Sequence, residues 1–291
     1  MTLRRRHRFV YMSVPEIQPT PPPLPLPPIW RLRWAIHLLI IAALPVIAGI
    51  SGLSRFTGDQ PALTHHASGL LIVCAWSLAF FAVPSAIAWL ISRPTVDELY
   101  LRWRPGFWVA PLGLVYSVAI RFGAGLILIG FYAILVATRV VSVQQMQELT
   151  SAQPAKLQSI LDVHALKHDP AYFWLNLTLV SFVVGGLREE IWRASFLAGM
   201  RSLWPRWFSS QGGQIAAAGV GAVLFGIGHL PQGTPAACLI GLVGFGLGVI
   251  MVCHRSIWPA VLAHGIFDAT SIALIPWVTE LVNQARQTTG A

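Results

Sequence analysis

Charged residues are scarce in this chain. Only 11% of its 291 residues are Asp, Glu, Lys or Arg, whereas 55% are hydrophobic and the mean hydropathy is +0.64. A soluble domain has about 25% charged residues, so the composition predicts a membrane protein. Acidic residues are fewer than basic ones, with 11 Asp and Glu against 20 Lys and Arg. Because the basic residues are spread over many short loops, they indicate a positive-inside bias, and we expect no nucleic-acid partner.

Cysteines and internal repeats are also scarce. The three cysteines, Cys74, Cys238 and Cys253, lie in apolar runs without CxxC spacing. We therefore interpret them as small buried hydrophobic residues and expect no disulfide. No internal repeat is apparent, so the inverted symmetry of many transporters finds no support in this sequence.

Long apolar runs, in contrast, are abundant. A helix needs about 17–25 apolar residues to cross a bilayer, and most of the runs reach that length. We therefore predict an all-α, polytopic transmembrane helix bundle with about seven spans, the acceptable range being six to eight. The predicted spans are 34–53, 68–92, 108–137, 172–199, 215–230, 236–253 and 258–279.

The segments around these spans predict the organisation of the chain. The start is basic and continues into a proline run that favours polyproline II, either as a spacer or as a ligand for a proline-reading partner. It does not have the pattern of an ordinary signal peptide. Counting Lys and Arg places the N-terminus in the cytoplasm, which means the plasma or inner membrane if the cell is bacterial. The predicted units are a tail (1–29), N-terminal transmembrane helices (30–140), an extracytoplasmic loop with an amphipathic helix (141–171), a catalytic core (172–279) and a C-terminal tail (280–291).

A short segment between the second and third spans, 93–107, has the pattern of an interfacial stretch. It carries Tyr100 and Trp103 beside arginines. Aromatic rings next to basic residues are typical of the headgroup region, so we expect both rings there.

Ionisable residues interrupt three of the last four spans, the fourth, the fifth and the seventh. Each costs roughly 2.5–3.5 kcal/mol at the centre of a bilayer on insertion scales, so such residues are rare and usually functional. At 1.5 Å of rise per residue, Glu189, His229 and His264 fall within about 6 Å of one plane, about 15 Å deep. This agreement predicts an active site within the membrane. The site residues form three i,i+4 pairs, Glu189 with Arg193, Phe225 with His229 and His264 with Asp268, and Glu190 adjoins the first pair.

The residue types in these pairs indicate acid–base chemistry. A guanidinium on Arg193 would keep Glu189 ionised, and an ionised, partly desolvated carboxylate is a credible general base for water. Asp268 would orient the imidazole of His264 and fix its tautomer. Two plainer readings stay open: the glutamates form a charge cluster near the headgroups, and His229 is a packing residue.

The motifs EExxR (Glu189 to Arg193), FGIGH (Phe225 to His229) and HGIFD (His264 to Asp268), in this order on successive spans, resemble a known family. They are similar to the CPBP family of intramembrane proteases, which includes type II CAAX prenyl endopeptidases, lysostaphin-resistance-protein-A-like (ABI-domain) proteins and bacteriocin self-immunity proteins. The resemblance covers roughly 172–279. It implies peptide-bond hydrolysis with water activated by Glu189 and assisted by His229, and with His264 stabilising the oxyanion or binding a metal.

Two positions depart from the pattern of that family. The family has Arg five residues after the first Glu, whereas Arg193 comes four after Glu189. Alignment on the arginine puts Arg188 at the first-Glu position, and alignment on the glutamates displaces the arginine. Glu189 is our choice for the water-activating residue, with Glu190 second. Asn is common where this chain has Asp268, and an ionised Asp cannot donate to an oxyanion.

Zinc and partners complete the hypothesis. Glu189, His229 and His264 would supply the three protein ligands that a catalytic zinc site needs, and a metal-free Glu/His pair is equally compatible. The expected partners are a peptide or membrane-protein substrate and the lipid bilayer. The main alternative is a catalytically inactive membrane scaffold or bacteriocin-immunity protein of the same fold. A proton-coupled transporter is the second alternative, because it too would place Glu, His and Arg at mid-membrane.

Overall fold

The computed structural model describes residues 27–53, 64–151 and 161–289, and every regular element in these ranges is helical. Seven helical segments are long and apolar enough to cross a membrane, which confirms the predicted all-α bundle. These segments are α1 (Pro28–Leu53), α2 (Ala67–Ser92), η1 (Gly106–Trp108) with α3 (Val109–Ala137), α7 (Pro170–Leu175) with η2 (Asn176–Leu187) and α8 (Arg188–Leu203), α10 (Gln211–Gly228), α11 (Thr234–His254) and α12 (Trp258–Thr289).

The predicted boundaries shift at several places. The first span begins at Pro28, inside the predicted tail, and residues 1–26 of that tail lie outside the described residues. The predicted loop contains two short helices, α4 (Val143–Ser151) and α6 (Val163–His168). Residues 152–160 between them lie outside the described residues. The amphipathic helix predicted for this loop can therefore be compared only with α4 and α6 on either side.

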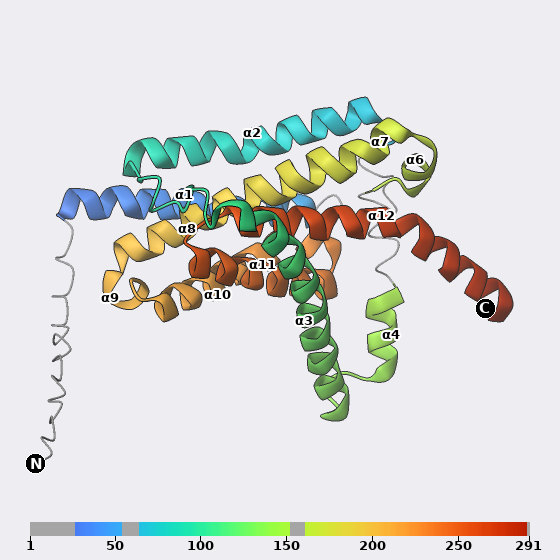
Figure 1. Cartoon of the computed structure of the whole chain (residues 1–291). Coiled ribbons are helices and arrows are strands. Elements are labelled where there is room, and N and C mark those ends of the chain that lie inside the picture. Colours follow the sequence, from blue (N-terminus) through green and yellow to red (C-terminus); the bar gives the residue numbers. More distant parts are fainter. Residues whose placement is uncertain (1–26, 54–63, 152–160, 290–291) are drawn as a thin grey trace, which may run out of the picture.

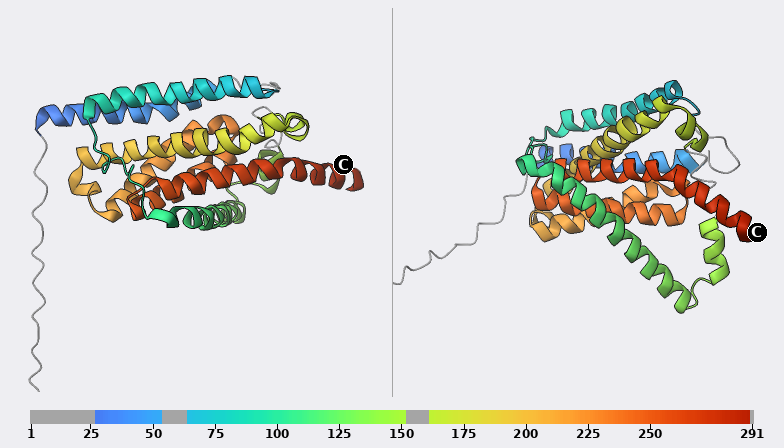
Figure 2. Two further views of the ribbon diagram at one scale, coloured as in Figure 1. Left: turned by 45° about the horizontal axis from the view of Figure 1, so that its top comes forward. Right: turned by 45° about the vertical axis from the view of Figure 1, so that its right-hand side comes forward.

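The helices pack as an elongated bundle (Figure 1). Helices α1 and α2 lie side by side, and α1 also contacts α8 and α10. α7, η2 and α8 follow one another along a single long axis, and α12 runs beside η2. α10 pairs with α11. Helix α3 packs on α12 and then diverges from the bundle, as Figure 2 shows, so that it is the least buried of the seven spans.

The fourth span changes its winding near the middle of its length. Residues Asn176–Leu187 form the π-helical segment η2, in which the Ser181 hydroxyl donates to the Asn176 carbonyl over 2.7 Å. π-Helical turns widen a helix and are frequent at functional sites. Gly186, near the end of η2, faces α12 so closely that a Cβ there would lie 2.8 Å from the Val261 carbonyl oxygen. The sequence thereby brings the start of α8 against α12.

Two expectations for individual residues were wrong. Tyr100 is buried inside the bundle and donates its hydroxyl to Gln214, because the Arg201 guanidinium and the following helices close over it. Trp103 is 55% exposed, as a headgroup-level residue requires. Of the cysteines only Cys74 is buried, whereas Cys238 and Cys253 are exposed on outward-facing positions of α11.

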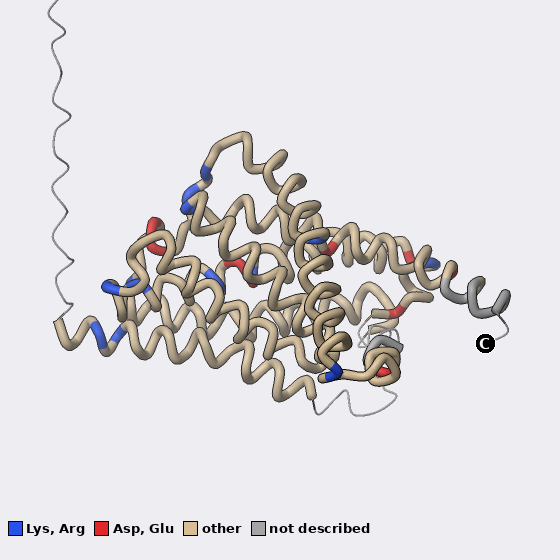
Figure 3. Tube along the Cα trace, turned by 90° about the horizontal axis from the view of Figure 1, so that it is seen from below, with Lys and Arg blue, Asp and Glu red and all other residues tan. Residues whose placement is uncertain are grey.

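Charges gather mainly at one end of the bundle, around the start of α1 (Figure 3). This asymmetry agrees with a positive-inside bias, and the cytoplasmic N-terminus stays a prediction. Figure 3 also shows acidic residues halfway along the bundle, far from either end.

Candidate active site

The first turn of α8 places two adjacent carboxylates in different surroundings. Glu189 lines a pocket of about 530 Å³, whereas Glu190 is completely buried behind it. Both lie within the fourth span, as the second and third residues of α8, which begins with Arg188 directly after the π-helical segment η2. Because consecutive residues of a helix point about 100° apart, one of the two carboxylates can face the pocket while the other faces the helix contacts.

The arginine of the EExxR motif pairs with the second glutamate. The Arg193 guanidinium forms an ion pair with Glu190, three residues earlier, and not with Glu189 as predicted. Arg193 is also buried and lies over the Phe225 ring, 4.8 Å from its centroid. The i,i+4 rule fails here because Glu189 is turned toward the pocket, so Glu190 is the carboxylate on the side of Arg193. Glu189 instead pairs with Arg188, Nη2 to Oε1, at 2.5 Å.

His264 on α12 connects the two carboxylates. Its Nδ1 lies 3.1 Å from Glu190 Oε1, and its Nε2 lies 3.7 Å from Glu189 Oε2. The same Nε2 lies 3.5 Å from Asp268 Oδ2, so the predicted i,i+4 pair forms. Three carboxylates thus surround one buried imidazole. The predicted convergence of Glu189 and His264 is therefore present in the fold.

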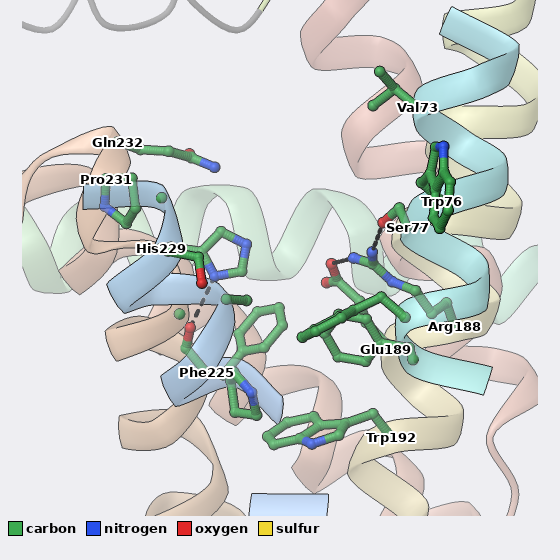
Figure 4. Close-up of a pocket in the computed structure, with 17 residues that line it drawn as sticks. Val73, Trp76, Ser77, Arg188, Glu189, Trp192, Phe225, His229, Pro231 and Gln232 are labelled. Carbon is green, nitrogen blue, oxygen red and sulfur yellow. Dashed lines mark hydrogen bonds and ion pairs between the residues drawn. The ribbon is translucent and has the colours of Figure 1, made fainter. Parts of the chain in front are cut away.

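His229 approaches the same pocket from the opposite wall, at the C-terminal end of α10 (Figure 4). Its Nδ1 lies 2.8 Å from the Phe225 carbonyl oxygen, and its ring packs on the Phe225 ring at a centroid distance of 4.6 Å. A carbonyl can only accept, so Nδ1 carries the hydrogen and, in the neutral imidazole, Nε2 has the lone pair. Figure 4 shows this second nitrogen turned toward Glu189 and Arg188.

The pocket lies between α1, α2, α8 and the end of α10, including the short helix η3 (Leu230–Gln232). Among the six site residues that the sequence predicts, Glu189 and His229 line it, and Glu190, Arg193, His264 and Asp268 do not. One wall includes Trp76, which is 74% exposed on the outer surface of α2. The rest of the lining is largely apolar, with Pro45, Ala48, Val73, Phe80, Phe81, Trp192, Phe225 and Pro231.

Sequence reasoning missed several polar residues of the pocket, among them Arg188 and Ser77. The Arg188 guanidinium donates to the Ser77 hydroxyl and to Glu189, and it lies over the Phe81 ring at 4.4 Å. The position of Arg188 beside the glutamates was a usable signal, but the sequence motifs gave it no function. Ser77 lies in an apolar run on α2 and gives no signal of its own.

The predicted zinc ligands do not form a ligand set in this arrangement. In the described part of the chain, no three His, Cys, Asp or Glu side chains are grouped as metal ligands. The reason is that His264 faces the carboxylates behind Glu189, whereas His229 stands on the far wall of the pocket. The donor set does not fit zinc, so we derive no catalytic step through a metal, and zinc dependence stays a prediction.

Comparison with known proteins places the same region in a family. Residues 170–270 match the family model "Type II CAAX prenyl endopeptidase Rce1-like". No curated protein and no solved structure matches the chain. The match contains the three motifs, from Glu189 to Asp268, and nearly the whole predicted core. With its seven apolar helices, the protein is an integral, multi-pass membrane protein. Its residues 170–270 are similar to the Rce1-like type II CAAX prenyl endopeptidases, and this match supports the resemblance to the CPBP family of intramembrane proteases.

Proposed function

We propose that this protein is an intramembrane endopeptidase that uses Glu189 and His229 to activate a water molecule. The observation that carries the proposal is the placement of these two side chains on opposite walls of one pocket, Glu189 at the start of α8 and His229 at the end of α10. A carboxylate and a neutral imidazole nitrogen are both proton acceptors. A water molecule between them can donate one hydrogen to each, which directs its oxygen lone pair at a third atom.

The reaction follows from that placement. Glu189 takes a proton from the water as the oxygen forms a bond to the peptide carbonyl carbon, and the carbonyl π electrons move onto its oxygen. The tetrahedral intermediate then collapses, the C–N bond breaks, and the leaving nitrogen receives the proton from Glu189. His229 holds the attacking water through Nε2, because Nδ1 is already bound to the Phe225 carbonyl.

The buried residues behind Glu189 support it without touching the substrate. His264 bonds to Glu190 and faces Glu189, so it fixes the side of the carboxylate that does not face the pocket. Arg193 compensates the charge of Glu190. Pre-organised groups of this kind need little reorganisation when charge moves during a reaction, so less energy is spent on it.

The surroundings of the pocket favour an apolar, membrane-embedded substrate. The walls carry Phe80, Phe81 and Val73, and Trp76 opens one wall toward the outer surface of α2. A peptide or membrane-protein tail with an apolar or lipid-modified segment can reach Glu189 from that side. The family name refers to prenylated CAAX proteins, and for this chain a CAAX-type tail is one member of the proposed substrate class.

Cleavage of a membrane-anchored reporter peptide library by the purified protein in lipid nanodiscs tests the proposal. Wild type is compared with Glu189→Gln and His229→Ala, each with and without a zinc chelator. We expect cleavage by wild type and a loss of at least about 10³-fold for Glu189→Gln, because the base is removed while the shape is kept.

The outcomes separate the alternatives. Cleavage by wild type that Glu189→Gln retains would refute the assigned base. No cleavage by folded wild type would favour the inactive scaffold or immunity protein of the same fold. Loss of wild-type cleavage on chelation would bring the zinc hypothesis back, although the donor set described above does not predict it.

A further inference from the structure

We propose that Arg188 is a further catalytic residue, which stabilises the oxyanion formed during peptide hydrolysis. The inference rests on the proposed function and adds a role that neither the motifs nor the family match assigns. Hydrolysis places a negative charge on the former carbonyl oxygen, and pre-organised donors at that point are usually the largest single contribution to catalysis. The pocket therefore needs a donor close to Glu189 and directed at the substrate.

The motif residues behind the pocket are poorly placed to stabilise an oxyanion. Asp268 is an acceptor when ionised and cannot donate to an oxyanion. His264 does not line the pocket, and both of its nitrogens face carboxylates, Glu190 on one side and Glu189 with Asp268 on the other. Glu190 and Arg193 are engaged with each other behind the pocket. None of these four side chains can reach a carbonyl oxygen in the pocket without breaking a buried ion pair.

Arg188 has the required charge and position. It is the only basic side chain other than His229 among the described residues that line the pocket, and it touches Glu189. Figure 4 shows its guanidinium between Ser77 and the Glu189 carboxylate, on the wall opposite His229. A carbonyl carbon attacked by water from Glu189 and His229 has its oxygen within the reach of a donor on this wall.

The hydrogen bonds of Arg188 do not occupy all the N–H donors of its guanidinium. Nη1 donates to Ser77 and Nη2 donates to Glu189, whereas Nε is buried without a hydrogen-bond partner among the described residues. The ring of Phe81 on α2, under the guanidinium at 4.4 Å, holds the plane of that group. A guanidinium has five N–H donors in a fixed geometry, so it can hold Glu189 and still donate to an oxyanion.

The charge of Arg188 also agrees with the course of the reaction. Before the attack the guanidinium neutralises the Glu189 carboxylate. As Glu189 takes the proton it becomes neutral, and the negative charge appears on the carbonyl oxygen instead. The guanidinium can then interact with the oxyanion, so the interaction strengthens in the transition state, which is the condition for lowering the barrier. Arg188 exchanges no proton and forms no bond in this step.

Steady-state kinetics of the full-length protein in nanodiscs tests the proposal, with an internally quenched, membrane-anchored peptide that wild type cleaves. The variants are Arg188→Gln, Arg188→Lys and Arg206→Gln. Arg206 is an exposed arginine outside the pocket, on the short helix α9 (Pro205–Phe208), and controls for the loss of one positive charge. We expect Arg188→Gln to lower kcat by about 10²-fold or more with little change in KM, Arg188→Lys to be intermediate, and Arg206→Gln to match wild type.

A second measurement uses a phosphonate analogue of the same peptide, whose tetrahedral anion resembles the intermediate. Its inhibition constant should rise in parallel with the loss of kcat/KM across the Arg188 variants, because transition-state analogues report the same interactions. An unchanged kcat in folded Arg188→Gln, or a change in KM alone, would overturn the assignment while leaving the protease intact. If Arg188→Gln does not fold, Arg188→Lys decides: full kcat and unweakened phosphonate inhibition overturn it. Absence of wild-type cleavage would instead remove the proposed function itself.

Discussion

Glu189 and Glu190 are neighbours in the chain but belong to different regions of the molecule. Glu189 lies in the pocket layer with Arg188 and His229, and Glu190 lies in the buried layer with Arg193 and His264. Arg188 retains 15% of its side-chain exposure, whereas Arg193 retains 1% and Glu190 none. The two Glu–Arg ion pairs therefore have the same chemical groups and differ in what surrounds them.

The difference in surroundings suits the pocket layer to the reaction and the buried layer to the stability of the fold. A charge in the pocket layer can be solvated by water in the pocket, so its partner can be removed at modest cost to the fold. A charge in the buried layer has no such substitute, and an uncompensated buried charge costs about 3–5 kcal/mol. The pocket layer is therefore free to change charge during a reaction, while the buried layer keeps a constant charge and fixes the geometry.

The largest difference is expected between Glu190→Gln and Glu189→Gln. Glu190→Gln leaves Arg193 buried and unpaired, so we expect it to lower the free energy of unfolding by about 3–5 kcal/mol. Glu189→Gln should cost clearly less, because Arg188 keeps its Ser77 contact and lies at the pocket. Unfolding of the purified variants in detergent, followed by intrinsic Trp fluorescence, gives both values. Equal losses would show that the two layers are not distinct.

A double substitution sharpens the same comparison. Arg193→Met alone leaves the buried Glu190 carboxylate with His264 as its remaining partner, and the loss of the guanidinium should also cost about 3–5 kcal/mol. The double variant Glu190→Leu/Arg193→Met removes both charges, and buried ion pairs replaced by apolar residues are often neutral or stabilising. We expect the double variant to recover most of the loss in the same unfolding assay. Additive losses would mean that each charge is held mainly by other groups.

The sequence was sufficient to predict the fold class and the approach of Glu189 to His264. Seven apolar runs became seven helices, because hydrocarbon requires every backbone group to be bonded within its own helix. The polar residues of the last four spans had to face inward, so Glu189 and His264 came together as their equal depths predicted. The contact between His264 and Asp268 followed from simple helical spacing.

The pairing of Arg193 could not be predicted in the same way. Helical spacing allows Arg193 to pair with Glu189 at i,i+4 or with Glu190 at i,i+3, and only the position of the pocket decides between them. The pocket in turn depends on α1 and α2, whose sequences show generic apolar runs. For the same reason the function of Arg188 was missed, since its partner Ser77 comes from α2.

A smaller effect on stability and cleavage is expected from separating η2 from α12. This helix contact holds Glu189 and Glu190, at the start of α8, against His264 on α12. In Gly186→Ala the new Cβ would lie 2.8 Å from the Val261 carbonyl oxygen, so the two helices must separate. We expect a loss of about 1–3 kcal/mol in the free energy of unfolding and a parallel loss of cleavage, as His264 moves away from Glu189. The matched control is Gly123→Ala on α3, where a Cβ meets nothing within 4 Å and should be neutral or slightly stabilising.

The smallest effect on stability is expected for an exposed ion pair outside the predicted spans. This pair serves as a water-accessible comparison for the ion pair of the buried layer. Asp162 lies 2.6 Å from His65 Nδ1, with the His65 side chain 57% exposed. Partial burial acts to raise the pKa of Asp162, but the Ala165 N–H and His65 more than offset it and hold the pKa below its ordinary value of 3.8. The stabilisation is therefore complete above pH 3.8 and is lost as the pH falls through the lower, folded-state pKa.

We expect Asp162→Asn to cost only about 0.2–1 kcal/mol at neutral pH, because water screens an exposed pair and the Asn can still cap α6. The difference between wild type and variant should vanish in acid, below the folded-state pKa of Asp162. Thermal unfolding in detergent from pH 7 to pH 3, with both proteins at equal concentration, measures it. A neutral-pH loss as large as that of Glu190→Gln would contradict the comparison, because burial would then not be what makes an ion pair of this protein costly to break.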